Sequence, residues 1–150
     1  AFDLVRGEMR SFDSKELQQQ VVEPAMQLLH DPKFHAAERA YQDALGEVTS
    51  GKPGDAITDA GTALQETLRA LGCEGKNLGP LIKSVRAKGL LAAHDVQMTQ
   101  AIEHIMEWVS AERSQKGDSH EVVTAEKADA WFIIHVVGAV IVRLVGASGR

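Results

Sequence analysis

The sequence has 150 residues, of which 44% are hydrophobic and only 5% aromatic, and its formal net charge is −5. That length suits one domain with a sizeable core, and the acidic balance excludes nucleic-acid binding driven by overall charge, leaving a local basic patch for any such role. A single cysteine, Cys73, excludes an internal disulfide and a CxxC metal site, which favours a reducing cytoplasm. Because alanine and leucine are abundant and aromatic residues sparse, the composition favours an all-α fold.

Helical periodicity begins near the N-terminus. Residues 14–31 predict a helix that Ser14 could cap and that Pro24 should break or kink, because proline removes a backbone donor. Residues 33–49 predict a second helix with one apolar stripe, made of Phe34, Ala37, Tyr41, Ala44, Leu45 and Val48. After a loop rich in glycine and proline, Asp55 is placed to cap a third helix over 55–71. The stripe of this third helix comprises Ile57, Ala60, Leu64, Leu68 and Leu71.

The second half of the chain predicts a short helix within 78–91 and two long ones. Residues 94–114 predict the first long helix, whose buried stripe comprises Met98, Ile102, Ile105, Met106 and Val109. The last helix follows Thr124, its expected N-cap, with Glu126 in the first turn. It is apolar nearly all round from Ala130 to Val145, so other helices or a second copy of the chain must cover it. Its apolar run, 130–142, is shorter than the ~20 residues of a bilayer crossing, which favours a buried helix over a membrane span.

The polar stretch ERSQKGDSHE, at 112–121, separates these two long helices. Arg113 ends one helix and His120 precedes the next, so both side chains could reach one pocket if the two helices are antiparallel neighbours. A neutral histidine can take a proton from an RNA 2′-hydroxyl or give one to the 5′-oxygen, and an arginine binds phosphate through its planar, permanently charged fork. The alternative is a helix C-terminus stabilised by a cation, followed by a surface histidine in a loop.

These residues resemble a known family. RSQKGDSH fits the R-x4–6-H motif of the HEPN superfamily (higher eukaryotes and prokaryotes nucleotide-binding), and GDSH followed by a long apolar helix is similar to the C-terminal domain of bacterial abortive-infection proteins. Two upstream stretches, DAITDAGTALQETLRALG and GKNLGPLIKSV, resemble that family's first core helix and the short helix after it. Since the resemblance covers residues 45–147, we expect a HEPN-like bundle domain at 45–150, preceded by an N-terminal helical extension at 1–44.

The resemblance implies an antiparallel bundle of about five helices that dimerises and brings two R-x4–6-H motifs together across the interface. It implies a metal-independent endoribonuclease without a cofactor, of the kind found in toxin–antitoxin and anti-phage systems. By the same resemblance, Arg113 binds phosphate and His120 is the catalytic histidine, while Glu66 and Asp118 match the acidic positions. Candidate substrate-binding residues are Ser114, Lys116, Lys83 and Arg86.

Several of these residues also have structural interpretations. Asp118 suits a tight turn after Gly117, Glu66 lies on the polar side of its helix, and the basic residues of 78–91 are typical of a soluble surface. His135, on the last helix, is expected to pack in the core or at an interface. No histidine has metal-ligand spacing, and Cys73 has no base partner in the sequence.

A second hypothesis is a non-catalytic HEPN module that dimerises and binds RNA or a nucleotide within a defence protein. Glu121 favours it, because this residue adds a negative charge beside a site meant to hold phosphate. A third is a purely structural dimerisation domain. The expected partners are RNA or a nucleotide and a second copy of the chain, with an antitoxin as a further candidate and without a membrane. The first residues, AFDLVRGEMR, lack the apolar region of a signal peptide, so we expect a cytoplasmic location.

Overall fold

A computed structural model describes residues 16, 18–90, 96–112 and 126–148. Within these ranges the chain is helical and contains no strand, which confirms the predicted all-α class. The elements are a π-helical turn η1 (Gln18–Val22), α2 (Glu23–Leu29), a 3-10 turn η2 (Pro32–Phe34), α3 (His35–Thr49), α4 (Pro53–Ala70), α5 (Leu78–Lys88), α6 (Val96–Glu112) and α7 (Lys127–Ser148). The first predicted helix is divided where Pro24 was expected to disturb it. Pro24 lies in the first turn of α2, a position where its missing donor costs no helical hydrogen bond.

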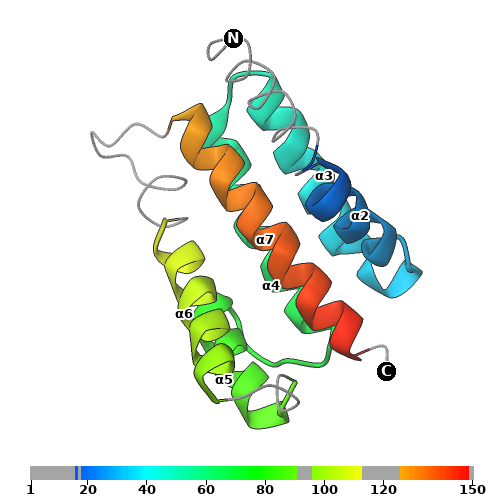
Figure 1. The fold of residues 1–150 in the computed structure, drawn as a ribbon, viewed down its shortest axis with the longest axis vertical. Coiled ribbons are helices and arrows are strands. Elements are labelled where there is room, and N and C mark those ends of the chain that lie inside the picture. Colours follow the sequence, from blue (N-terminus) through cyan, green and yellow to red (C-terminus); the bar gives the residue numbers. More distant parts are fainter. Residues whose placement is uncertain (1–15, 17, 91–95, 113–125, 149–150) are drawn as a thin grey trace, which may run out of the picture.

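The helices pack around a central pair, α4 and α7 (Figure 1). Helices α2 and α3 lie on one side of this pair, and α5 and α6 on the other. Helix α3 runs antiparallel to α4, and α6 antiparallel to α7, whereas α4 and α7 run in the same direction. The bundle is therefore not antiparallel throughout. The expected domain boundary between residues 44 and 45 falls inside α3, a single helix that packs along α4.

The apolar stripes predicted for α3 and α4 form the core between these helices. All the residues predicted for α3 are buried except Leu45, which is half-buried, and all those for α4 are buried except the half-buried Leu71. Tyr41, fully buried on α3, donates a hydrogen bond of 3.0 Å from its hydroxyl to the carbonyl of Ile134 on α7. Burial raises the pKa of the Tyr41 phenol well above its usual range, so this hydroxyl stays protonated and remains a donor.

Helix α4 is covered on all sides. No residue from Ala56 to Ala70 is exposed, although the sequence predicted a polar, outward side for this helix. Threonines on it satisfy their hydroxyls within the helix: Thr62 donates to the carbonyl of Thr58 at 3.1 Å, and Thr67 to that of Ala63 at 2.7 Å. Because these hydroxyls need no water, α4 can lie in the centre of the bundle.

The start of α4 differs from the prediction. Asp55 was expected to cap the helix, but α4 begins at Pro53, with Lys52 at the N-cap position and Asp55 inside the first turn. Proline favours the first helical position because its fixed φ suits a helix and its missing N–H needs no partner there. Asp55 still lies where the helix dipole favours an acid.

Helix α6 buries a narrower stripe than predicted. Met106 and Val109 are buried, but Ile105 is 40% exposed, so its assignment to the core was wrong. Ile105 precedes Met106 by one residue, which turns it about 100° away from the buried side. The side chains of Met98 and Ile102 lie outside the described part. Cys73 is buried and free, in the loop between α4 and α5.

Helix α7 is longer than its predicted apolar run. The stretch Lys127–Gly146 has a mean hydropathy of 1.9 and the length of a membrane span, and about half of it is buried inside the bundle. Buried residues recur along one side of α7, from Ala130 to Val145. The core helix of a soluble bundle has the same composition, so this stretch is weak evidence of a span.

The α3–α4 hairpin brings two carboxyl groups within hydrogen-bonding reach of each other, those of Glu47 and Asp59. One oxygen of Glu47, Oε1, is buried and accepts no hydrogen bond. Burial, the hydrogen bond to Asp59 and the charges of Asp59, Asp55 and Asp43 raise the pKa of Glu47 to about 8. A hydrogen bond between two carboxyl groups requires a proton, so this contact is lost when both groups ionise.

We expect stability to fall as the pH rises from about 4.5 to about 8, because in this window the folded chain holds a proton on Glu47 that the unfolded chain releases. Glu47→Gln should remove this slope and, at pH 8, raise the free energy of unfolding by about 1 kcal/mol, less than the full pKa displacement because solvent reaches part of the side chain. Urea unfolding at pH 5 and 8 measures both effects. Glu74→Gln, which changes an exposed acid in the loop after α4, is the control. An unchanged slope in Glu47→Gln would contradict the assignment.

Candidate functional site

The ends of α6 and α7 lie side by side. Trp108, one turn before the end of α6, meets Phe132, near the start of α7, with ring centroids 5.4 Å apart and planes at 63°. The edge of one ring thus faces the other ring, a favoured aromatic arrangement. This contact confirms that the helices flanking the Arg113–His120 stretch are neighbours, as their short connection predicted. Arg113, Ser114, Lys116, Asp118 and His120 themselves lie outside the described residues.

The start of α7 is held by an acid in its first turn. The backbone N–H of Glu126 donates to the Asp129 carboxylate at 3.2 Å. Glu126 was expected in this first turn, but α7 begins at Lys127, so Glu126 precedes the helix and Asp129 takes the predicted place. An acid here is stabilised by the positive end of the helix dipole. Thr124, the expected N-cap, lies outside the described residues.

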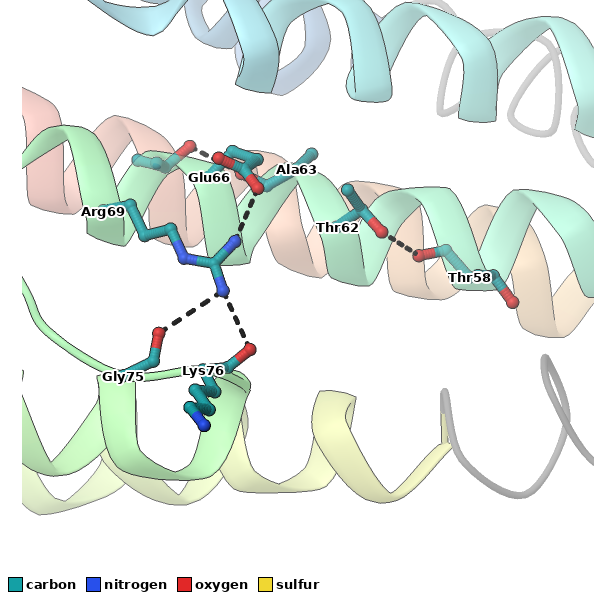
Figure 2. Close-up of polar contacts among 8 residues, drawn as sticks. Thr58, Thr62, Ala63, Glu66, Arg69, Gly75 and Lys76 are labelled. Carbon is teal, nitrogen blue, oxygen red and sulfur yellow. Dashed lines mark hydrogen bonds and ion pairs between the residues drawn. The ribbon is translucent and has the colours of Figure 1, made fainter.

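Glu66 belongs to a polar network at the end of α4, drawn in Figure 2. Its carboxylate accepts a hydrogen bond of 2.7 Å from Arg69, one turn later. The same guanidinium donates to the carbonyls of Gly75, at 3.3 Å, and Lys76, at 2.8 Å. Arg69 therefore fastens the loop before α5 to α4, and Glu66 supplies the negative charge that keeps this arginine in place.

The position of Glu66 along α4 separates it from the start of α7. Both helices begin at the same end of the bundle and run in the same direction (Figure 1). Glu66 is 13 residues after Pro53 (66 − 53), which is about 20 Å along α4 at ~1.5 Å per residue. The Glu66 carboxylate therefore lies toward the C-terminal half of α7, away from the helix ends that flank residues 113–125.

The two predicted basic ligands of α5 differ in their surroundings. Lys83 is exposed. Arg86 donates from Nε to both carboxylate oxygens of Glu103 on α6, at 3.2 and 3.1 Å, and a second guanidinium nitrogen also reaches Oε2. Glu103 is only 2% exposed, and its hydrogen bonds raise the pKa of Arg86 above its usual value. Arg86 is thus the partner of a buried carboxylate, while Lys83 is available to solvent.

His135 and Cys73 show no sign of catalytic activation. The imidazole of His135 stacks on the Trp131 ring, with centroids 5.5 Å apart and an angle of 21°. Partial burial lowers the pKa of His135 against the opposing effect of the Trp131 backbone, and within one chain the residue is half-buried instead of lying in the core. Burial likewise raises the pKa of the Cys73 thiol, more than its contacts with Ser84 and Lys88 lower it, which disfavours the nucleophilic thiolate.

Two residues that the sequence did not single out, Arg69 and Glu103, make the hydrogen bonds that hold Glu66 and Arg86 in place. Arg69 had a local signal, since its spacing of three from Glu66 permits a pair on one helix face. Glu103 had none, because its partner Arg86 lies on another helix. Among the residues that the structure describes, no group of three or more His, Cys, Asp or Glu side chains could hold a metal ion. Comparison with protein-family models, curated proteins and solved structures finds no match to this chain.

Proposed function

We propose that this chain is a homodimeric, metal-independent endoribonuclease of the HEPN type, acting in a toxin or abortive-infection system in the cytoplasm. The proposal depends on the RSQKGDSH motif and on one observation: the two helices that flank it, α6 and α7, pack with Trp108 against Phe132. Arg113 directly follows α6, and His120 precedes α7 by seven residues (127 − 120). A motif carried by two adjoining helix ends can present both side chains to one phosphate.

In this proposal His120 transfers protons and Arg113 holds the phosphate. The neutral imidazole would take the proton of the 2′-hydroxyl, or give one to the 5′-oxygen as it leaves. The guanidinium would offset the negative charge that grows on the phosphate oxygens in the transition state. Of the two acidic candidates, we assign the orienting role to Asp118, within the motif. Glu66 already pairs with Arg69 and lies farther along the bundle.

Three of the four basic and polar candidates share the proposed substrate-binding role. Ser114 and Lys116 belong to the motif segment and would contact the phosphate nearest the cut. Lys83 is exposed and would contact a more distant phosphate. We do not assign Arg86 to RNA, since a phosphate would have to replace Glu103, whose buried carboxylate would then lose its partner.

We expect the purified protein to cleave cellular RNA in excess chelator. His120→Ala and Arg113→Ala should each lower the cleavage rate at least about 100-fold, the usual contribution of a positioned proton donor or charge clamp. Gel analysis of RNA fragments over time measures the rate. His35→Ala, which changes an exposed histidine at the start of α3, should cleave like the wild type. Cleavage that persists in both motif variants would rule the assignment out.

A second candidate, a non-catalytic HEPN module that binds RNA or a nucleotide, is favoured by the acids around the motif. Glu121 directly follows His120, and the net charge is −5. Expression in a bacterial host separates the two candidates. The endoribonuclease should slow growth in the wild type but not in His120→Ala, whereas a binding module should burden growth equally in both. An antitoxin, if the host operon supplies one, should relieve only the first effect.

A further inference from the structure

The outward side of α7 is apolar along most of its length. Between Ala128 and Gly146, the residues that are exposed or half-buried are Trp131, Phe132, His135, Val136, Ala139, Val142 and Arg143, together with Ala128, Asp129 and Gly146. Ile105 and Trp108 of α6, 40% and 37% exposed, extend this surface beside Phe132, which is 59% exposed. We call the surface formed by these two helices the α7 face. Large apolar side chains gathered in this way mark an interaction surface.

The charges of the α7 face favour self-association. Full charges on the outward side of α7 lie near its ends: the exposed Lys127 and the half-buried Asp129 at the start, and Arg143 toward the other end. Asp129 and Arg143 have partners within the chain, so neither is a bare charge. Between Asp129 and Arg143 the α7 face offers no full charge to a partner rich in acids or bases. A second copy of the chain would present a surface whose middle is equally uncharged.

We infer that a second copy of this chain packs antiparallel on the α7 face, with Phe132 of each copy seated over Ala139 of the other. Phe132 and Ala139 lie equally far from the point between His135 and Val136, so one twofold axis there pairs them twice. Asp129 and Arg143 lie equally far from Val136, so nearly the same axis places opposite charges together. Size and charge complementarity thus give axis positions that differ by only half a residue. The inference rests on the homodimer of the proposed function.

A parallel arrangement fails both criteria. It would place Phe132 against Phe132 and Arg143 against Arg143, so bulky side chains would collide and like charges would meet. Helix α7 has 22 residues, about 33 Å, and is ~10 Å across, so its outward side covers roughly 330 Å², and Ile105 and Trp108 of α6 widen the α7 face at one end.

The arrangement has a consequence for the motif. With the axis near the middle of α7, the two α7 starts are about 25 Å apart, because each lies eight to nine residues from the axis. The start of one α7 then lies beside the partner's Arg143. The two α7 starts, which the motif segments precede in the chain, would therefore not face each other across the axis.

Sedimentation velocity tests the surface. We expect the wild type to be a dimer at micromolar concentration, and Ala139→Glu to weaken the dimer at least about 100-fold, because it buries two charges without partners. Ala139 is exposed within one chain, so the variant should fold, as circular dichroism will show. Ala36→Glu, at an exposed alanine of α3, should dimerise like the wild type. A monomeric wild type, or a fully dimeric Ala139→Glu, would overturn the inference.

Cross-linking tests the direction. In a Cys73→Ala background, a chain with Phe132→Cys mixed with a chain with Ala139→Cys should form a disulfide between copies, while neither variant should do so alone. A disulfide in Phe132→Cys alone would indicate the parallel arrangement and overturn the inference. Neither measurement uses RNA, so a failure of the dimer inference can be told apart from a failure of the proposed nuclease function. A His120-dependent nuclease that is monomeric would refute only the dimer, and an inactive antiparallel dimer would refute only the nuclease.

Discussion

Gly138→Ala should lower the free energy of unfolding by about 2–3 kcal/mol. A Cβ at this position of α7 would lie 2.4 Å from the Tyr41 hydroxyl and 2.9 Å from Cγ1 of Val21, both too close for any contact. Tyr41 cannot move away freely, because its ring is fully buried and its hydroxyl donates to Ile134. The added methyl therefore overpacks the junction of η1, α3 and α7 and weakens a buried hydrogen bond, and both effects cost stability. Chemical denaturation measures the change.

Two further variants make this prediction specific. Tyr41→Phe removes the hydroxyl that the new methyl meets, so the double variant Tyr41→Phe with Gly138→Ala should lose less than the sum of the single losses. Gly46→Ala, in an exposed part of α3 with no atom within 4 Å of the added carbon, should instead stabilise the protein by about 0.5–1 kcal/mol. If Gly138→Ala behaves like Gly46→Ala, the close approach of α7 to α3 is not as described.

The helices and their buried sides follow from periodicity wherever one side of a helix faces the core. In α3 and α4 the structure buries the predicted stripes, Tyr41 and Leu64 among them, except for the half-buried Leu45 and Leu71. Periodicity does not show how many other helices pack against a given helix. Glu66 was placed on a solvated side, yet α4 is covered by α3, α5 and α7, and Glu66 is half-buried beside Arg69. Ile105 was placed in the buried stripe of α6, but the structure turns this side chain outward, since α6 contacts its neighbours along a narrower line than predicted.

Some features of the candidate site could likewise be predicted from the sequence, and others could not. That the Arg113–His120 stretch connects two neighbouring long helices could be predicted, because a short polar stretch between two apolar periods has few other arrangements. The orientation of the side chains of that stretch could not be predicted, since a polar stretch without periodicity gives no orientation. The partner of Arg86 could not be predicted either, because residues 17 positions apart meet only through the packing of α5 on α6. Lys83 and Arg86 look alike in the sequence, and only the buried Glu103 separates their roles.

Arg86→Met should lower the melting temperature by about 5 °C, whereas Lys83→Met, three residues earlier on α5, should change it by about 1 °C or less. The difference comes from Glu103, which is only 2% exposed and whose carboxylate accepts hydrogen bonds from Arg86 on both of its oxygens. Without the guanidinium, its carboxylate must either remain buried without a partner or take up a proton, and both cost stability at neutral pH. Lys83 is exposed, and its loss leaves nothing unpaired.

The pair can be removed as a whole to separate a structural role from RNA binding. Arg86→Met with Glu103→Met replaces both charges by apolar chains of similar length, so the double variant should recover most of the lost melting temperature. In filter binding with single-stranded RNA, Lys83→Met should weaken affinity and reduce its salt dependence, because one phosphate contact is lost. The double variant Arg86→Met with Glu103→Met should bind RNA like the wild type. If it binds more weakly than Lys83→Met, Arg86 contacts phosphate despite its pairing with Glu103, and the ion pair is an exchangeable part of the RNA surface instead of a fixed link between α5 and α6.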